Sequence, residues 1–136
     1  MKILVVHRQK GVIEQVKSVL DSGNVFISTT DSGLDGLLTS RIEKFDLIIC
    51  GTDLPVVTGF ELVRNIRNNS INKNSTVIFL SDDVEEKTEH LAQALGVAGI
   101  VGYMEFNDRL ALLINEHVQV APDKTWKDLV PHDHIN

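Results

Sequence analysis

The chain has 136 residues, 43% of them hydrophobic, which suffices for one well-buried core but not for two comfortable domains. Acidic residues outnumber basic ones by 19 to 13, and the formal charge of −6 comes without any block of lysine or arginine, which disfavours a nucleic-acid or anionic-membrane surface. The single cysteine, Cys50, excludes a disulfide framework and a cysteine metal site, and we expect it to be a buried thiol.

The first residues predict a buried strand. Lys2 is followed by a short apolar run from Ile3 to Val6, which ends at His7. This run is too short for a signal peptide and far too short to cross a bilayer. We therefore expect a soluble cytoplasmic protein whose first strand runs from Lys2 to Val6.

Helix and strand patterns then alternate. A helix is predicted from about Gly11 to Ser22, with Gly23 suited to a left-handed C-terminal cap, and a second strand from about Asn24 to Thr29. Asp31 or Ser32 can cap the next helix. Its glycines weaken that helix, and its large apolar residues are expected to form one face: Leu34, Leu37, Leu38 and Ile42.

The apolar run from Phe45 to Cys50 predicts a strand that is buried on both faces, as in the middle of a parallel sheet. Gly51, Thr52 and Asp53 follow it, and they fall where open α/β folds place their ligand-binding crevice. A new helix is expected to start at Thr58 or Gly59. Its apolar face would consist of Phe60, Leu62, Val63 and Ile66.

The remaining elements complete five β/α alternations. A polar connector over 68–75 precedes a strand from Thr76 to Leu80, which ends at Ser81. The later elements are a helix from about Val84 to Leu95, a strand from about Gly99 to Tyr103 and a helix from about Asn107 to His117 with Leu110, Leu113 and Ile114 inward. This pattern predicts a flavodoxin-like, doubly wound parallel sheet of five strands in the order 2-1-3-4-5, with helices on both faces.

The periodic pattern ends at residue 117, so we divide the chain into a domain over 1–117 and a tail or docking segment over 118–136. The tail is expected to pack partly through Trp126 and then to fray. His132 and His134 alternate without a third ligand nearby, which is a weak metal signal.

The stretch from Asp46 to Leu62 resembles the response-regulator receiver domain of two-component signalling. That family carries the pattern Asp-Leu-Ile-x-x-Asp-x-x-x-Pro-x-x-x-Gly-Phe-Glu-Leu, and this chain follows it without a gap, with Pro55 and Gly59 in register. The resemblance covers roughly 1–117 and implies the same fold. Its phosphoacceptor aspartate falls on Gly51, which has no carboxylate to act as a nucleophile.

Other parts of the phosphorylation chemistry are also replaced. The resemblance places the acidic, Mg²⁺-binding pair on His7 and Arg8, and a guanidinium there opposes a cation. The family's lysine falls on Tyr103, or on Met104 if Phe106 is matched to the family's phenylalanine.

The hydroxyl position is kept as Ser81, which can serve as a switch hydroxyl or cap the acidic start of the next helix. The next position, small in the family, holds Asp82, whose charge would repel a phosphoryl group. These departures point to a degenerate receiver, or pseudo-receiver.

Asp53 is the remaining candidate phosphoacceptor. It lies two residues beyond the family's position, so its use would break the gap-free match. Its alternative role is a loop carboxylate paired with Arg8 or His7, as a surface ion pair worth no more than about 1 kcal/mol.

The leading hypothesis is a receiver-like module of a bacterial phosphorelay that acts by protein–protein interaction without phosphorylation. The alternatives are a divergent receiver phosphorylated on Asp53 and a flavodoxin-like nucleotide or flavin binder, although the loop from His7 to Gly11 is a weak anion site. We expect no enzymatic activity, cofactor or metal. A protein partner or a second copy would bind the face of the fourth helix, fifth strand and fifth helix. This face is expected to carry Glu85, Glu86, Glu89, His90, Tyr103, Met104, Asp108 and Arg109.

Overall fold

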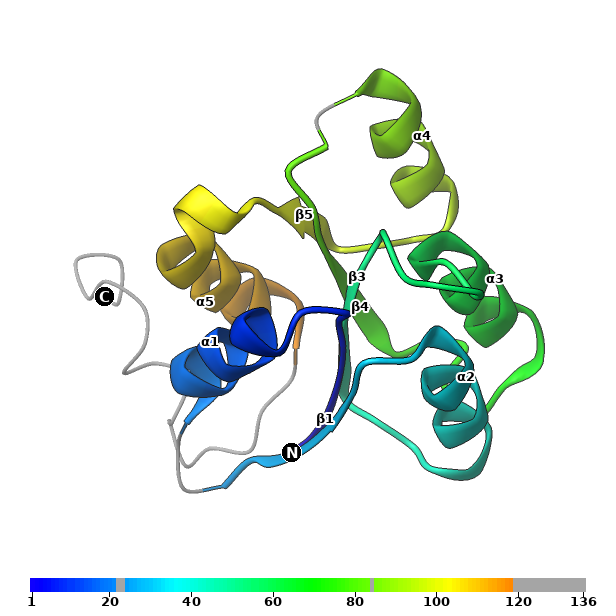
Figure 1. Ribbon diagram of the computed structural model, residues 1–136. Coiled ribbons are helices and arrows are strands. Elements are labelled where there is room, and N and C mark those ends of the chain that lie inside the picture. Colours follow the sequence, from blue (N-terminus) through cyan, green and yellow to red (C-terminus); the bar gives the residue numbers. More distant parts are fainter. Residues whose placement is uncertain (22–23, 84, 119–136) are drawn as a thin grey trace.

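A parallel sheet forms the centre of the molecule. The computed structural model describes residues 1–21, 24–83 and 85–118. Five strands lie in the order β2-β1-β3-β4-β5 (Figure 1), which confirms the predicted flavodoxin-like arrangement. The strands are β1 (Lys2–Val6), β2 (Phe26–Thr30), β3 (Leu47–Gly51), β4 (Thr76–Leu80) and β5 (Gly99–Val101).

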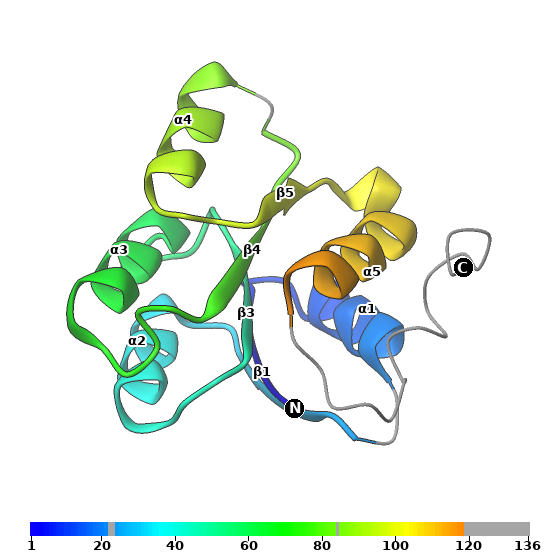
Figure 2. The ribbon, with the colours of Figure 1, turned by 180° about the vertical axis from the view of Figure 1, so that it is seen from behind.

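Helices cover both faces of the sheet. α1 and α5 lie side by side on one face, while α2, α3 and α4 lie on the other, as two opposite views show (Figure 1, Figure 2). A short 3-10 turn, η1 (Tyr103–Glu105), leads into α5. The helices are α1 (Lys10–Leu20), α2 (Gly33–Ile42), α3 (Gly59–Asn69), α4 (Glu86–Ala94) and α5 (Phe106–His117).

The two faces of the sheet bury separate apolar clusters because successive side chains of a strand point in opposite directions. On β1, Ile3 and Val5 pack under α1 and α5, whereas Leu4 and Val6 pack under the other three helices. Every residue of β3 is buried, as predicted for the central strand. Each fully buried aliphatic side chain contributes roughly 1.5–3 kcal/mol, so the two clusters account for the main favourable term in folding.

The start of α3 lies against the end of β3 and shapes the carboxyl edge of the sheet. Thr58 and Glu61 form a capping box, in which the Thr58 hydroxyl accepts the Glu61 N–H at 3.2 Å and the Glu61 carboxylate accepts the Thr58 N–H at 3.1 Å. A Cβ atom at Gly59 would collide with the carbonyl oxygen of Gly51. Glycine is therefore required for α3 to approach β3 this closely.

Several predicted boundaries were wrong by a few residues. β2 begins at Phe26 rather than Asn24, and the chain leaves β5 after Val101. The reason at β5 is that the Tyr103 N–H donates to the Asp82 carboxylate at 2.8 Å instead of continuing the strand ladder. α4 begins at Glu86, and Val84, where the sequence placed its start, lies outside the described residues.

Most of the large apolar residues that were predicted to share one face of α2 do not pack against the core. Leu37 packs against the core, but Leu34, Leu38 and Ile42 are 48%, 50% and 84% exposed. The buried residues of this helix are instead Gly33, Gly36 and Ser40. Small residues face the sheet because α2 lies so close to its neighbours that larger side chains would not fit there.

The end of the described chain packs onto the core, since Val118 is buried in the cluster under α1 and α5. The predictions for Trp126, His132 and His134, and the left-handed cap predicted at Gly23, lie outside the described residues. The boundary between a domain over 1–117 and a tail over 118–136 stays a prediction.

Candidate functional site

Parallel strands end together at the carboxyl edge of the sheet, and a crevice of about 230 Å³ opens there. The loops after β1, β3, β4 and β5 line it. Its lining residues are His7, Arg8, Gln9, Thr52, Asp53, Leu80, Ser81, Asp82 and Tyr103. The fold therefore brings together most of the side chains that the sequence singled out for this edge, with Gly51 beneath the His7 ring and Met104 outside the lining.

His7 is the buried centre of the crevice, at 3% exposure. Its Nδ1 accepts the backbone N–H of Gln9 at 3.0 Å, so the proton of the neutral ring is on Nε2. That Nε2–H donates to the Tyr103 hydroxyl oxygen at 2.7 Å. Burial lowers the pKa of His7, and the nearby charge of Arg8 acts in the same direction. The ring is therefore neutral and held at both nitrogens.

The His7 imidazole lies over Gly51. A Cβ atom on Gly51 would be 2.8 Å from His7 Cδ2 and 3.2 Å from His7 Nε2, closer than carbon atoms normally approach in a folded protein. Any side chain at position 51 would therefore have to displace the ring. The histidine fills the space that a residue with a side chain would need.

Tyr103 is attached to the crevice at two points. Its hydroxyl accepts from His7, and its backbone N–H donates to Asp82 at 2.8 Å. The Tyr103 and His7 rings also meet edge to face, at 5.8 Å between centroids and an angle of 86°. Burial raises the pKa of Tyr103, with further contributions from the Asp82 and Asp53 carboxylates. Met104, by contrast, is 97% exposed and does not line the crevice.

Arg8 and Asp53 close the outer side of the crevice. Arg8 Nη1 lies 3.0 Å from Asp53 Oδ2, which confirms the predicted loop ion pair and identifies Arg8 rather than His7 as the partner. Both side chains are exposed, so the pair contributes at most about 1 kcal/mol to stability.

Ser81 is buried at the end of β4, and its hydroxyl accepts the backbone N–H of Asp83 at 2.9 Å. Asp83 in turn accepts from the Glu85 N–H at 2.9 Å and from the Thr88 hydroxyl at 2.7 Å. These bonds lower the pKa of Asp83, led by the one from Thr88. Ser81 therefore stabilises the turn before α4, close to the capping role considered for it.

The sequence model of the response regulator receiver domain matches residues 3–107. The chain belongs to this family. Receiver domains are signalling modules rather than typical enzymes, and the chain is thus a receiver domain of the two-component type.

Relatives of this receiver domain are longer proteins. The cell cycle transcriptional regulator CtrA of Caulobacter vibrioides is 25% identical over 92 residues, which cover 68% of this chain and 40% of that protein. The cell cycle response regulator CtrA of Brucella ovis is 22% identical over 91 residues, 67% of this chain and 39% of that protein. The chain spans about two fifths of the length of these relatives.

Solved receiver structures are similar in fold. Chemotaxis response regulator CheY4 of Vibrio cholerae superimposes with a TM-score of 0.75 at 25% identity, covering 87% of this chain and 98% of that one. The HemR receiver domain of Leptospira biflexa gives a TM-score of 0.77 at 19% identity, covering 88% and 95% of the two chains. At 19% identity the likeness to HemR shows the fold alone.

Sequence reasoning missed how three residues of the crevice interact. One run of hydrogen bonds joins His7, Tyr103 and Asp82, which the resemblance had singled out separately. The sequence did offer one signal: these residues follow strands whose carboxyl ends meet at one edge of a parallel sheet. No pattern in the sequence shows which pairs of them make contact.

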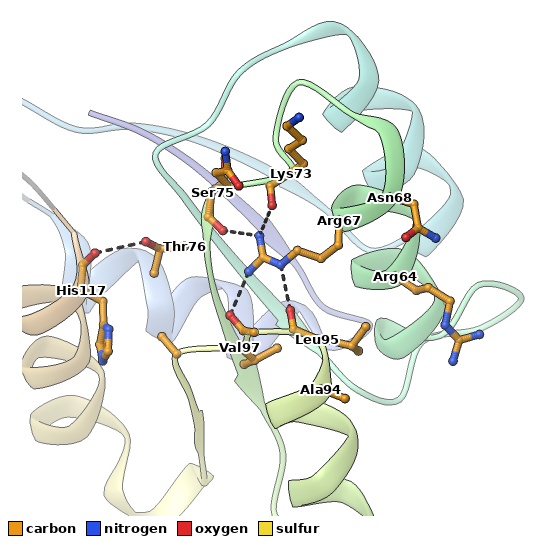
Figure 3. Close-up of a pocket in the computed structure, with 13 residues that line it drawn as sticks. Arg64, Arg67, Asn68, Lys73, Ser75, Thr76, Ala94, Leu95, Val97 and His117 are labelled. Atoms are coloured by element: carbon orange, nitrogen blue, oxygen red, sulfur yellow. Dashed lines mark hydrogen bonds between the residues drawn. The ribbon is translucent and has the colours of Figure 1, made fainter.

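A cavity of about 720 Å³ lies at the opposite, amino-terminal edge of the sheet (Figure 3). Arg67 lies across it, and its guanidinium donates to the carbonyls of Leu95 and Ser75 at 2.8 and 2.7 Å and of Lys73 and Gly96 at 3.0 Å (Figure 3). With these bonds, Arg67 fastens α3 to the chain before β4 and to the end of α4.

The described residues hold no group of three or more His, Cys, Asp or Glu side chains suited to a metal ion. A helix long and apolar enough to cross a bilayer is not found in the described part of the chain either. Cys50 is free and fully buried, and burial raises the pKa of its thiol to about 12.

Proposed function

We propose that this receiver domain works without aspartyl phosphorylation, as a protein-interaction module of a two-component type system. The observation that carries the proposal is the His7 ring over Gly51: the residue at the family's phosphoacceptor position has no side chain, and the space for one is filled. A carboxylate nucleophile is needed to form an acyl phosphate. The domain has none at that position.

The donor groups around the crevice do not fit the Mg²⁺ ion that the family resemblance implies. Mg²⁺ requires hard oxygen ligands in octahedral geometry. One position of the acidic pair holds His7, whose two ring nitrogens are both engaged in hydrogen bonds, and the other holds the cation of Arg8. The exposed carboxylate of Asp53 is paired with that same Arg8 cation. Bringing a divalent cation here would require this ion pair to open.

The test is incubation of the full chain with Mg²⁺ and acetyl phosphate, followed by intact-mass measurement. We expect no stable gain of one phosphoryl group. A gain that disappears in Asp53→Asn would instead support the divergent receiver phosphorylated on Asp53. A gain that persists in that variant would contradict both ideas.

The crevice also offers little to the phosphate groups of a nucleotide or flavin. Asp53 and Asp82 both line it, and their charges repel a phosphate. A nucleotide or flavin binder would show a higher melting temperature after addition of FMN or ATP. An interaction module would show no change.

We further propose that the partner binds the face formed by α4, β5 and α5 and that it is basic with an apolar anchor. A hollow of about 400 Å³ on this face is lined by the exposed Met104 side chain, by Ile100 and by four carboxylates, without a lysine or arginine. The carboxylates are Asp82, Asp83, Glu89 and Glu105. The negative charge around the hollow disfavours a second copy of the same hollow against it. Tyr103, which the sequence assigned to the same face, points into the crevice instead.

Charge reversal tests this surface. Glu89→Lys with Glu105→Lys is expected to reduce capture of partners from lysate at least about tenfold, because both substitutions place cations beside the hollow. Glu14→Lys on α1, which is not part of the α4-β5-α5 face, serves as the control and should leave capture unchanged. Equal loss in the two variants would contradict the assignment of the partner to the α4-β5-α5 face.

A further inference from the structure

α2 presents an apolar ridge to solvent. Leu34, Leu38 and Ile42 follow each other at intervals of four residues, so they form one continuous row along the helix, and each is about half-exposed or more. We call these three residues the α2 ridge. A surface helix normally turns such a row toward the core. In α2 the row faces solvent instead.

The helix cannot rotate to bury the ridge. Its inner face carries Gly33 and Gly36, and a Cβ atom at Gly33 would collide with the carbonyl oxygen of Val57. At Gly36 a Cβ atom would already lie 3.0 Å from Val6 Cγ2 and 3.4 Å from Leu62 Cδ2. A leucine turned into this space would overlap β1 and α3. The ridge therefore faces outward in the folded domain, and none of the described residues covers it.

We propose that two copies of this chain associate through the α2 ridge, with the two helices antiparallel about a twofold axis that passes near Leu38. Ridges of residues spaced by four interdigitate in the commonest class of helix packing. Leu38 lies at the middle of the ridge, so the twofold axis brings the Leu38 side chains together and places Leu34 against the partner's Ile42. A symmetric contact of this kind uses the same patch on both subunits.

The charges at the two ends of α2 favour a second copy in this orientation. Asp31 and Asp35 lie at its amino-terminal end. Arg41 and Lys44 lie at its carboxyl-terminal end, where the intervening Glu43 is already paired with Lys2. An antiparallel pair brings the acidic end of each helix to the basic end of the other, whereas a parallel pair brings like charges together. In the described part of the chain, neither the Asp35 carboxylate nor the Arg41 guanidinium has an ion-pair partner.

The size of the patch sets the expected strength. Stable complexes bury about 800 Å² on each partner, and a ridge of three side chains covers less than that. The dimer is therefore expected to be weak and to depend on concentration. The hollow on the α4-β5-α5 face is a poor site for a second copy of itself, because it is lined by carboxylates without lysine or arginine.

Disulfide trapping tests the arrangement in the full chain. Cys50 is fully buried, so a cysteine introduced on the surface is the reactive thiol. With oxidised glutathione, Leu38→Cys should form a covalent dimer more than about tenfold faster than the exposed control Met104→Cys, because association raises the local thiol concentration. A mixture of Leu34→Cys and Ile42→Cys should form the mixed dimer faster than either variant dimerises alone.

Two results of the disulfide trapping would contradict the proposal. Leu38→Cys that dimerises no faster than Met104→Cys overturns the proposal. Leu34→Cys that dimerises alone as fast as the mixture shows parallel helices and also refutes it.

Sedimentation of the unmodified chain gives a second readout that needs no cysteine. At up to about 1 mM protein its average mass should rise with concentration, and Leu38→Glu should remain monomeric with an unchanged circular-dichroism spectrum. If the unmodified chain also stays monomeric over this range, the second copy is the wrong occupant of the ridge.

Discussion

Gly51 and His7 are complementary in shape. The imidazole can lie over the end of β3 only because position 51 has no Cβ atom, and a larger residue at position 51 is excluded only because the imidazole is there. The lack of a side chain at position 51 and the position of the His7 ring therefore depend on each other. Burial of the ring at this place also keeps His7 neutral, because burial lowers the pKa of the imidazole.

This contact predicts strong coupling between the two positions. Gly51→Ala should lower the free energy of unfolding by about 1–3 kcal/mol, because the added methyl group overlaps the histidine ring. In a His7→Ala background the same substitution should lower it by much less, giving a coupling of at least about 1 kcal/mol in a urea double-mutant cycle. Gly11→Ala is the control, because a Cβ atom there meets nothing within 4 Å. Additive effects at positions 7 and 51 would contradict the assigned contact.

The lowered pKa of His7 also predicts how stability depends on pH. In the unfolded chain a histidine takes up a proton near pH 6.5, whereas in the folded domain it does so only at lower pH. The unfolded state therefore binds more protons as the pH falls below 6.5, and the free energy of unfolding falls with it. Between pH 7.5 and pH 5, roughly spanning that titration, the melting temperature of the natural chain should drop more than that of His7→Gln. Parallel curves for the two proteins would show that His7 is not the group responsible.

Whole elements of this domain are joined by single polar side chains at the amino-terminal edge of the sheet. Asn72 is fully buried and donates to the carbonyls of Ser40 and Glu43 at 2.6 and 2.8 Å, while its side-chain oxygen accepts the Phe45 N–H at 2.7 Å. It thus connects the end of α2 to the start of β3. Arg67 connects α3 to the end of α4 in a similar way.

Arg67→Ala is therefore expected to destabilise the domain by about 1.5–3 kcal/mol, the usual range for losing hydrogen bonds from a charged group. Arg64, one turn earlier on α3, lines the same cavity and is exposed, so Arg64→Ala should change the free energy of unfolding by no more than about 0.5 kcal/mol. Urea unfolding of the two variants measures the difference. Equal effects would mean that the four carbonyl contacts of Arg67 contribute nothing specific.

The same elements show what sequence patterns can predict here. Strands such as β3 and β4 are continuous apolar runs between turn signals, so hydrophobicity locates them well. α2 misled the prediction because periodicity reports that leucines share a face but not which way that face points. Glycines allowed the close approach that turned the leucines outward. Asn72 was assigned to a polar loop, since composition cannot distinguish an exposed asparagine from one that satisfies buried backbone groups.

At the scale of the whole molecule, the receiver fold and the receiver chemistry are separable. The two apolar clusters lie on the faces of the sheet, whereas the crevice is built from loop residues at the carboxyl ends of the strands. Replacing the crevice side chains therefore leaves the packing that stabilises the fold intact. Hydrogen bonds among His7, Tyr103 and Asp82 join the loops that follow β1, β4 and β5.

This separation predicts that the chemistry can be rebuilt on the present backbone. A variant with His7→Asp, Arg8→Asp, Gly51→Asp, Asp82→Ala and Tyr103→Lys restores the groups that the family resemblance implies and removes the ring that blocks position 51. With Mg²⁺ and acetyl phosphate it should gain the mass of one phosphoryl group, because a carboxylate nucleophile and hard metal ligands are again present. The matched control carries the other four substitutions but keeps Gly51, and it should bind Mg²⁺ without gaining mass. If the rebuilt variant keeps the circular-dichroism spectrum of the natural chain and still fails to bind Mg²⁺, loop geometry rather than side-chain identity separates this domain from a working receiver.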